Sequence, residues 1–224
     1  MKKESGKKAG RRKCFLFFAA VFVSAILGIR LWTAGADQAY VGEHIVCEPI
    51  SLISWEERLR PEYLADYADC LTDLEDGDIL VTCCTHTFGW RNGHAAMVID
   101  AEQELTLEAV MLGSKSCVQS VTKWRGYPGA AVLRLKGVSA GERSRIAQWA
   151  MEHLLEVDYG FSADLLDRLR NGESWNTHCA HLVWEAYQTF GYDVDGDGGV
   201  IVTPRDLYES PLFEVVEAYG MEGW

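Results

Sequence analysis

The spacing of apolar and polar positions changes along the chain after its N-terminal segment. Short apolar runs of strand length come first, separated by turn residues, at Ile79–Val81, Ala95–Ile99, Leu105–Val110 and within residues 130–138. After residue 139, apolar residues recur at spacings of three and four, which indicates helices. Strands followed by helices predict an α+β fold in one domain, with the strands in an antiparallel meander.

Three helices are expected after the strands. The first begins at Ser139 with Glu142 three residues later, the pattern of a capping box. Its apolar stripe comprises Ile146, Trp149, Ala150, Leu154 and Val157. A shorter helix is expected over residues 161–172, ending at Gly172. The third runs from about Cys179 to Phe190, with Asn176 or Thr177 as its N-cap, and therefore begins at a cysteine.

The N-terminal 36 residues form a separate unit. A basic start is followed by an uninterrupted apolar run over residues 14–29, which Leu31 and Trp32 extend to residue 32. This arrangement is typical of a signal peptide or a signal anchor. Ala34 and Ala36 suit a cleavage site, whereas the extended run approaches the roughly 20 residues of a spanning helix, so both alternatives stay open. Either one predicts an exported, extracytoplasmic body.

The body of the chain divides into two further parts. Residues 37–70 are weakly patterned and are interpreted as a linker that leads into a short helical segment, where Pro61 suits an early helical position. Residues 71–218 carry the strands and helices and form the predicted globular domain. At 48% hydrophobic and 24% charged residues, the composition is that of a globular protein with a sizeable core.

Charge is unevenly distributed along the chain. Residues 1–36 hold eight Lys or Arg and one Glu, which leaves 13 of the 21 basic residues and 32 of the 33 acidic residues for the rest. That remainder has a formal charge of −19. An acidic body repels phosphate backbones, so nucleic acid is excluded as a partner.

Six cysteines belong to the body, namely Cys47, Cys70, Cys83, Cys84, Cys117 and Cys179. An exported location permits disulfides, and Cys47 with Cys70 is one candidate bridge, although spacing does not determine the pairing. Cys179 stands apart because it is expected at the N-terminus of a helix. The helix dipole and unpaired backbone N–H groups favour the thiolate there, and the thiolate is the nucleophilic form.

A nucleophilic thiol needs a base and a group that orients the base. Of the histidines, His94 begins a strand directly after Gly93, and Glu108 lies in the following strand. Adjacent antiparallel strands can place such a pair side by side. Cys179, His94 and Glu108 are therefore the candidate catalytic residues. His178 precedes the helix and is at most a neighbour of the thiol, while His181 is turned about 200° away from it.

These segments, in this order, resemble a known family. The pattern LEDGDILVT, GHAAMVID, LEAV and WRGYPGAAVLRL, followed by HCAHLVWEAYQTFGYDVDGDGGVIVTPRDLYESPLFEVV, is similar to the permuted branch of the NlpC-type papain-like cysteine hydrolases, the YiiX-like group. The resemblance covers residues 71–216 and implies a permuted papain-like fold, with an antiparallel sheet or small barrel packed on helices. It assigns Cys179 as nucleophile, His94 as base and Glu108 as the third polar residue.

The chain departs from the family pattern at two places. Where the family reads Tyr-Cys-Ser, this chain has His178, Cys179 and Ala180, which removes a hydroxyl donor beside the thiol. The Gly-x-x-Tyr-Asp region preceding the cysteine is also altered, to EVDYGF.

Three segments contain residue types that bind metal ions. CCTH at residues 83–86 and HCAH at residues 178–181 offer zinc ligands, but their spacings fit no standard zinc pattern, and neighbouring cysteines of a strand would point to opposite faces. DVDGDGGVIVTP resembles a calcium loop, yet Pro204 stands where a bidentate Glu is needed, which favours an Asp- and Gly-rich turn. No metal or cofactor is expected.

The expected function is that of an exported or membrane-anchored cysteine hydrolase of amide bonds. The resemblance implies a substrate from the cell envelope, such as peptidoglycan peptides, and contact with the membrane through the N-terminal segment. Two alternatives remain: a lipid amidase or acyltransferase on the same fold, and a catalytically silent envelope-binding module, which the altered cysteine motif favours.

Overall fold

The computed structural model describes residues 20, 21, 23, 24, 28, 43–161, 176–222 and 224. Most of the apolar N-terminal run and nearly all of the helix expected over residues 161–172 lie outside the described residues. Within the described part of the chain, no helix is both long enough and apolar enough to span a membrane.

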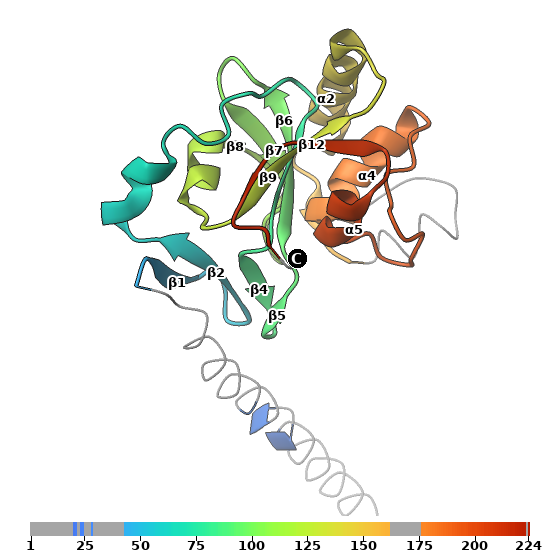
Figure 1. Ribbon diagram of the computed structural model, residues 1–224. Helices are drawn as coiled ribbons and strands as arrows, with labels where there is room; N and C mark the ends of the chain where they lie inside the picture. Colours follow the sequence, from blue (N-terminus) through green and yellow to red (C-terminus); the bar gives the residue numbers. More distant parts are fainter. Residues whose placement is uncertain (1–19, 22, 25–27, 29–42, 162–175, 223) are drawn as a thin grey trace, which may run out of the picture.

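The centre of the molecule is a six-stranded antiparallel sheet (Figure 1). Its strands, in spatial order, are β12 (Phe213–Tyr219), β9 (Ala130–Leu135), β3 (Ile79–Thr82), β6 (His94–Asp100), β7 (Leu105–Glu108) and β8 (Cys117–Ser120). The predicted α+β class with an antiparallel sheet is confirmed. Among the described residues, β12 and β8 are the two edges, so the six strands form an open sheet and not a small barrel.

The predicted order of strands is partly wrong. β6, β7 and β8 do form a meander, but β9 pairs with β3 on the far side of β6 instead of extending the meander beyond β7. A short strand that apolar alternation did not reveal, β8, pairs with β7 and occupies that position. The chain then passes through the 3₁₀ helix η2 (Val121–Gly126) before β9 begins.

Helices pack on the central strand β6. α2 (Ala140–Leu154) and α4 (Cys179–Thr189) both contact β6 and each other, and the short α5 (Pro204–Glu209) packs against α4 and β3. The Ser139 side chain caps α2 by accepting a hydrogen bond from the Glu142 N–H, which is the serine half of the predicted capping box, while the Glu142 carboxylate bonds Arg145. Ala95 and Ala96 are both fully buried in β6, and because neighbouring strand residues point to opposite faces, only one of these small side chains lies on the face that the helices cover.

The prediction for the N-cap of α4 is wrong. Asn176 and Thr177 form β11 (Asn176–Thr177), which pairs in parallel with β10 (Asp158–Tyr159), so their backbones are occupied by a β-bridge. The N-cap is His178, whose imidazole accepts a hydrogen bond from the His181 N–H.

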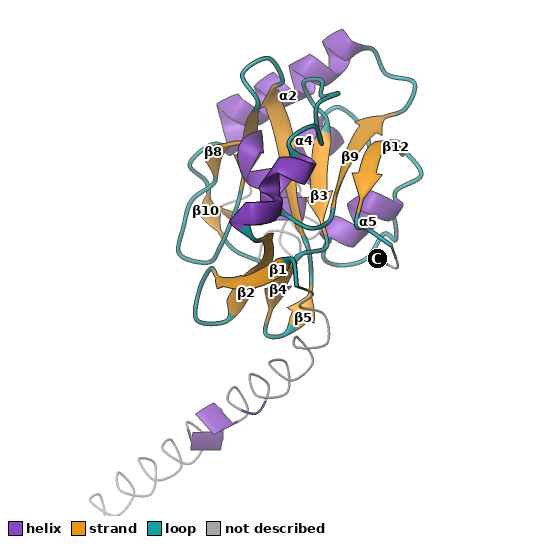
Figure 2. Ribbon diagram, turned by 60° about the vertical axis from the view of Figure 1, so that its left-hand side comes forward, coloured by secondary structure: helices purple, strands orange, loops and turns teal. Residues whose placement is uncertain are grey.

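The interpretation of residues 37–70 as a linker is also wrong for most of their described length. They supply β1 (Ile45–Pro49) and β2 (Ser54–Leu59), which join β4 (Thr85–Thr87) and β5 (Trp90–Arg91) in a second antiparallel sheet, and the short helix η1 (Pro61–Tyr67) follows. Figure 2 shows this small sheet at one end of the molecule. Alternation in β2 is hidden because Glu56 and Glu57 are buried.

Steric constraints explain why a glycine precedes His94 at the start of β6. Gly93 has a φ of 74°, and a Cβ there would lie 2.7 Å from the carbonyl oxygen of Thr82 and 2.6 Å from the Trp224 ring. Only glycine fits this conformation and this close approach. His94 then pairs with Thr82 of β3 and enters the sheet as the first residue of β6.

Candidate active site

Cys179 is the first helical residue of α4 and is 7% exposed. The helix begins here because residues 176–178 are extended and β11 delivers the chain to the face of β6. The thiol therefore lies at the positive end of the helix, against the strand that begins with His94.

The structure brings the other two predicted residues together. His94 Nε2 lies 2.9 Å from Glu108 Oε2, although 14 residues separate them in the chain. They belong to neighbouring antiparallel strands, as the sequence predicted. His94 also hydrogen bonds to Cys179. Because Nε2 is committed to Glu108, Nδ1 is the ring nitrogen that faces the thiol. Cys179, His94 and Glu108 thus form one chain of contacts.

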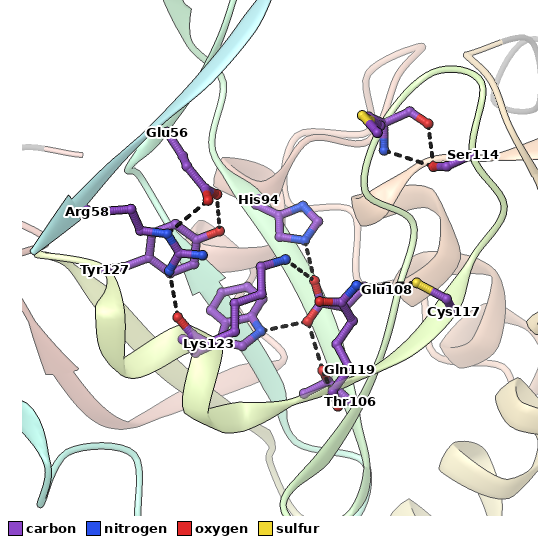
Figure 3. Close-up of polar contacts among 12 residues, drawn as sticks. Glu56, Arg58, His94, Thr106, Glu108, Ser114, Cys117, Gln119, Lys123 and Tyr127 are labelled. Atoms are coloured by element: carbon purple, nitrogen blue, oxygen red, sulfur yellow. Dashed lines mark hydrogen bonds and ion pairs between the residues drawn. The ribbon is translucent and has the colours of Figure 1, made fainter. Parts of the chain in front are cut away.

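Glu108 is completely buried and accepts hydrogen bonds from four side chains (Figure 3). His94 and the ammonium of Lys123, at 3.1 Å, bind Oε2, while Thr106 Oγ1 and Trp124 Nε1, both at 2.8 Å, bind Oε1. Trp124 also stacks on the His94 ring, with centroids 5.4 Å apart. Every lone pair that a buried carboxylate needs to satisfy has a donor, and the imidazole is held in one orientation.

The ionised forms of Cys179, His94 and Glu108 are strongly stabilised. Burial raises the pKa of the Cys179 thiol, but hydrogen bonds and positive charge from His178 and His94 outweigh burial and lower the pKa to about 5. Burial lowers the pKa of His94, but Cys179 and Glu108 raise it to about 9. His94 and Lys123 hold the pKa of Glu108 well below its usual range despite its burial. At a pH between about 5 and about 9, the resting state of Cys179 and His94 is therefore a thiolate–imidazolium pair.

His178 contributes more than the sequence suggested. Besides capping α4, it hydrogen bonds to Cys179 and is the largest favourable influence on the pKa of that thiol. The thiol therefore has two imidazole partners. His178 occupies the position where the family that the sequence resembles carries tyrosine, so this departure places a second imidazole beside the thiol.

A pocket of about 500 Å³ opens beside the thiol and is lined by Cys179, His94 and residues of both sheets. Much of its wall is apolar, including Ile50, Ile53, Phe88, Met111, Leu112 and Phe161. The polar lining residues include Lys123 and Thr85, and the Thr85 hydroxyl is buried without a hydrogen-bond partner among the described residues. The small sheet supplies much of this wall.

Several residues of the site were not singled out as functional residues in the sequence. Lys123 and Trp124 lie on η2, a 3₁₀ helix that apolar periodicity does not predict. Tyr159 lines the pocket next to Cys179, and burial together with the charge of Cys179 raises its pKa well above the ordinary value. Its phenol therefore stays protonated. The altered EVDYGF segment was the one hint at Tyr159.

The remaining histidines take structural positions. His181 is buried on the side of α4 away from the thiol and contacts Thr177 Oγ1. His86 lines the pocket, where it stacks on Trp55 and bonds Glu57 at 3.0 Å. His153 stacks on Trp149 of α2.

The expectation for Cys83 and Cys84 is wrong. They lie in the connection between β3 and β4 and not in a strand, and their sulfurs are 3.9 Å apart instead of pointing to opposite faces. Arg91 donates to the Cys83 sulfur, and this contact together with Cys84 lowers the pKa of Cys83 to about 7. Cys70 is a free thiol, so the candidate bridge with Cys47 does not form.

The calcium-like loop brings carboxylate oxygens of Asp195, Asp197 and Asp206 within 4.8 Å of one another. However, Asp206 accepts both Thr203 donors in the capping box of α5, and the other two carboxylates accept backbone N–H groups of Gly198 and Gly199. These are the contacts of an Asp- and Gly-rich turn.

Comparison with known proteins finds a similar sequence and a similar solved structure, while no family model matches the chain. The uncharacterized protein YycO of Bacillus subtilis (strain 168) is 25% identical over 127 residues. The match covers 56% of this chain and 49% of YycO, so it spans about half the length of that relative.

The crystal structure of the metalloprotein yiiX from Escherichia coli O157:H7 superposes with a TM-score of 0.51 and 17% identity. The match covers 64% of this chain and 96% of that one. The fold is YiiX-like. This agrees with the resemblance seen in the sequence as far as the YiiX-like group, and at this identity the likeness extends to the fold alone.

The pH dependence of alkylation tests the electrostatics of the thiol. Because the thiolate is the reactive form, we expect iodoacetamide to label Cys179 with a midpoint at about pH 5. His178→Asn keeps a good N-cap but removes the imidazole, so its midpoint should rise while thermal stability is retained. Peptide mass spectrometry separates Cys179 from the other cysteines. A wild-type midpoint near 8.5, that of an ordinary thiol, would contradict the assignment.

Replacement of Lys123 tests its influence on His94. In Lys123→Met the full negative charge of Glu108 acts on the imidazolium without a competing cation, so the pKa of His94 should rise above its value of about 9. Loss of one donor to a buried carboxylate should also cost about 1–3 kcal/mol in stability. Lys123→Arg restores the cation and serves as control. The measurement is an NMR titration of the His94 ring, and an unchanged or lowered pKa in Lys123→Met would contradict the prediction.

Proposed function

We propose that the protein is a cysteine hydrolase that cleaves amide bonds through Cys179, His94 and Glu108, on the NlpC-type papain-like plan. The observation that carries this proposal is the chain of contacts from thiol to imidazole to buried carboxylate, at the edge of a pocket. An ion pair of this kind has a clear use in acyl transfer, since it supplies a nucleophile and an acid together at neutral pH.

The reaction follows from the positions of these groups. The Cys179 thiolate attacks the carbonyl carbon of the substrate, and the negative oxygen of the tetrahedral intermediate is held by the backbone N–H at the start of α4. His94 then donates its proton to the amine nitrogen, the C–N bond breaks, and the amine leaves. An acyl thioester remains on the sulfur. His94, now neutral, takes a proton from water, which attacks the thioester and releases the carboxylic acid.

Glu108 does not touch the substrate in this scheme. It holds the His94 ring and stabilises the imidazolium, the role of the third member of a triad. Trp124 and Thr106 fix the carboxylate in turn. This support keeps the imidazole oriented when the proton moves.

Substrates of two kinds fit the export expected from the sequence. The first is cell-envelope material such as peptidoglycan peptides, which the family resemblance implies. The second is a lipid amide, or an acyl group passed to another acceptor, and the apolar wall of the pocket beside Cys179 favours it.

A silent binding module is the third candidate, and the site argues against it. The departure at His178 does not separate the three core residues and instead lowers the pKa of the thiol. The structural neighbour yiiX is described as a metalloprotein. In the described part of this chain, three potential ligands meet only at Asp195, Asp197 and Asp206, none of which lines the pocket, so the proposed reaction assigns no step to a metal ion.

Activity assays of the full chain distinguish the candidates. We expect a long-chain N-acyl amide or a peptidoglycan stem peptide to be hydrolysed, and Cys179→Ala or His94→Gln to lose at least about a thousandfold in rate. New fatty acid, read by mass spectrometry, identifies a lipid amidase, and new amino groups on stem peptides identify a peptidase.

His153→Gln, a matched change of a histidine outside the pocket, controls for general effects of removing an imidazole. If Cys179 shows the labelling of an ordinary thiol and Cys179→Ala leaves every measured turnover unchanged, the silent module is correct and the enzyme is not.

A further inference from the structure

Large apolar side chains surround the mouth of the pocket and face solvent. Four residues that line the pocket are also strongly exposed: Leu52 at 83%, Phe88 at 46%, Leu112 at 67% and Phe161 at 52%. They come from four separate connections of the chain, and Trp90, 78% exposed, stands two residues beyond Phe88. Single exposed apolar residues are ordinary, but a set arranged around one opening marks a contact surface.

The hairpin that carries Phe88 has an unfavourable sequence for its shape. Thr87 pairs with Trp90, so Phe88 and Gly89 form a two-residue turn, and both have positive φ, at 52° and 83°. Turns of this kind favour Asn followed by Gly, because a bulky side chain is strained in the left-handed region. A Phe in this strained conformation, with 46% of its surface exposed at the pocket, points to a role in contact with a ligand or a surface.

The position of the hairpin agrees with contact to a membrane. β4 and β5 belong to the small sheet whose first strand, β1, begins at Ile45. The apolar run that the sequence predicts to enter or span the membrane ends at residue 32. The intervening residues span at most about 40 Å when fully extended, so a retained anchor would keep this sheet near the bilayer surface.

We propose that the rim formed by Leu52, Phe88, Trp90, Leu112 and Phe161 inserts into the surface of a lipid bilayer. Trp and Phe are the side chains typical of the interfacial zone, and their apolar area supplies the binding energy. With its formal charge of −19, the body is not drawn to anionic lipids, so insertion depends on apolar contact and suits a zwitterionic surface.

A lipid surface explains the arrangement better than a protein partner does. A protein seated on these side chains would close the pocket that they surround. A bilayer instead places its acyl chains at the opening, so an acyl group can pass from lipid to the apolar wall without crossing water. This inference concerns docking and is separate from the proposed chemistry, because it can be measured with Cys179→Ala.

Quenching of Trp90 by brominated lipid tests the proposal. The full chain carrying Cys179→Ala is reconstituted into phosphatidylcholine vesicles with and without bromine on the acyl chains, and the same is done with Trp90→Phe added. The difference in emission between the two proteins reports Trp90 alone. We expect brominated lipid to quench this component and aqueous iodide to leave it largely unquenched.

Phe88→Asn provides the sharper variant. Asn suits the left-handed turn, so the thermal midpoint should stay the same or rise, while quenching of Trp90 by brominated lipid should fall at least about threefold. Val200→Asn, at a residue 60% exposed that does not line the pocket, is the matched control and should quench like the parent.

The proposal is overturned if brominated lipid leaves the Trp90 component unquenched while iodide reaches it, or if Phe88→Asn and Val200→Asn quench alike. Neither outcome depends on whether Cys179 is a nucleophile.

Discussion

The buried carboxylate of Glu108 is the group around which this site is organised. A fully buried negative charge is costly unless hydrogen bonds and opposite charge compensate for it, and here four side chains do so. Those donors come from β6, β7 and η2, so the carboxylate can be satisfied only when these elements are in place. The orientation of His94, and through it the state of Cys179, follows from that requirement.

Two features of the site balance the charge that Glu108 introduces. Lys123 shares Oε2 with His94, which limits how strongly the carboxylate acts on the imidazole. His178 also hydrogen bonds to the thiol and favours the thiolate. The motif of the family that the sequence resembles has a serine that is absent here, and the second imidazole stands next to the thiol where that motif has tyrosine. The site thus reaches an ion pair by its own combination of partners.

The small sheet is the part of the molecule that sets access to this chemistry. It forms much of the pocket wall, carries the strained turn at Phe88 and lies closest in sequence to the apolar N-terminal run. The large sheet and its helices hold Cys179, His94 and Glu108, whereas the small sheet forms much of the wall through which a ligand would reach them. An apolar wall and an apolar rim together favour an acyl chain over a peptide as the bound group. The proposed docking surface therefore supports a lipid amide as the substrate.

The sequence by itself determined the elements whose signals are local. Apolar runs predicted β3, β6, β7 and β9, periodicity predicted α2 and α4, and the placing of Gly93 and His94 before one strand and Glu108 in the next predicted their contact. Only the tertiary structure decided the rest. β2 was hidden because its glutamates are buried and bonded, η2 has no periodicity to read, and the partners of Glu108 come from positions that local pattern cannot relate. The donors to a buried charge are the groups that lie near it in space, wherever they stand in the chain. The pattern of apolar residues along a chain indicates burial only for side chains that are themselves apolar.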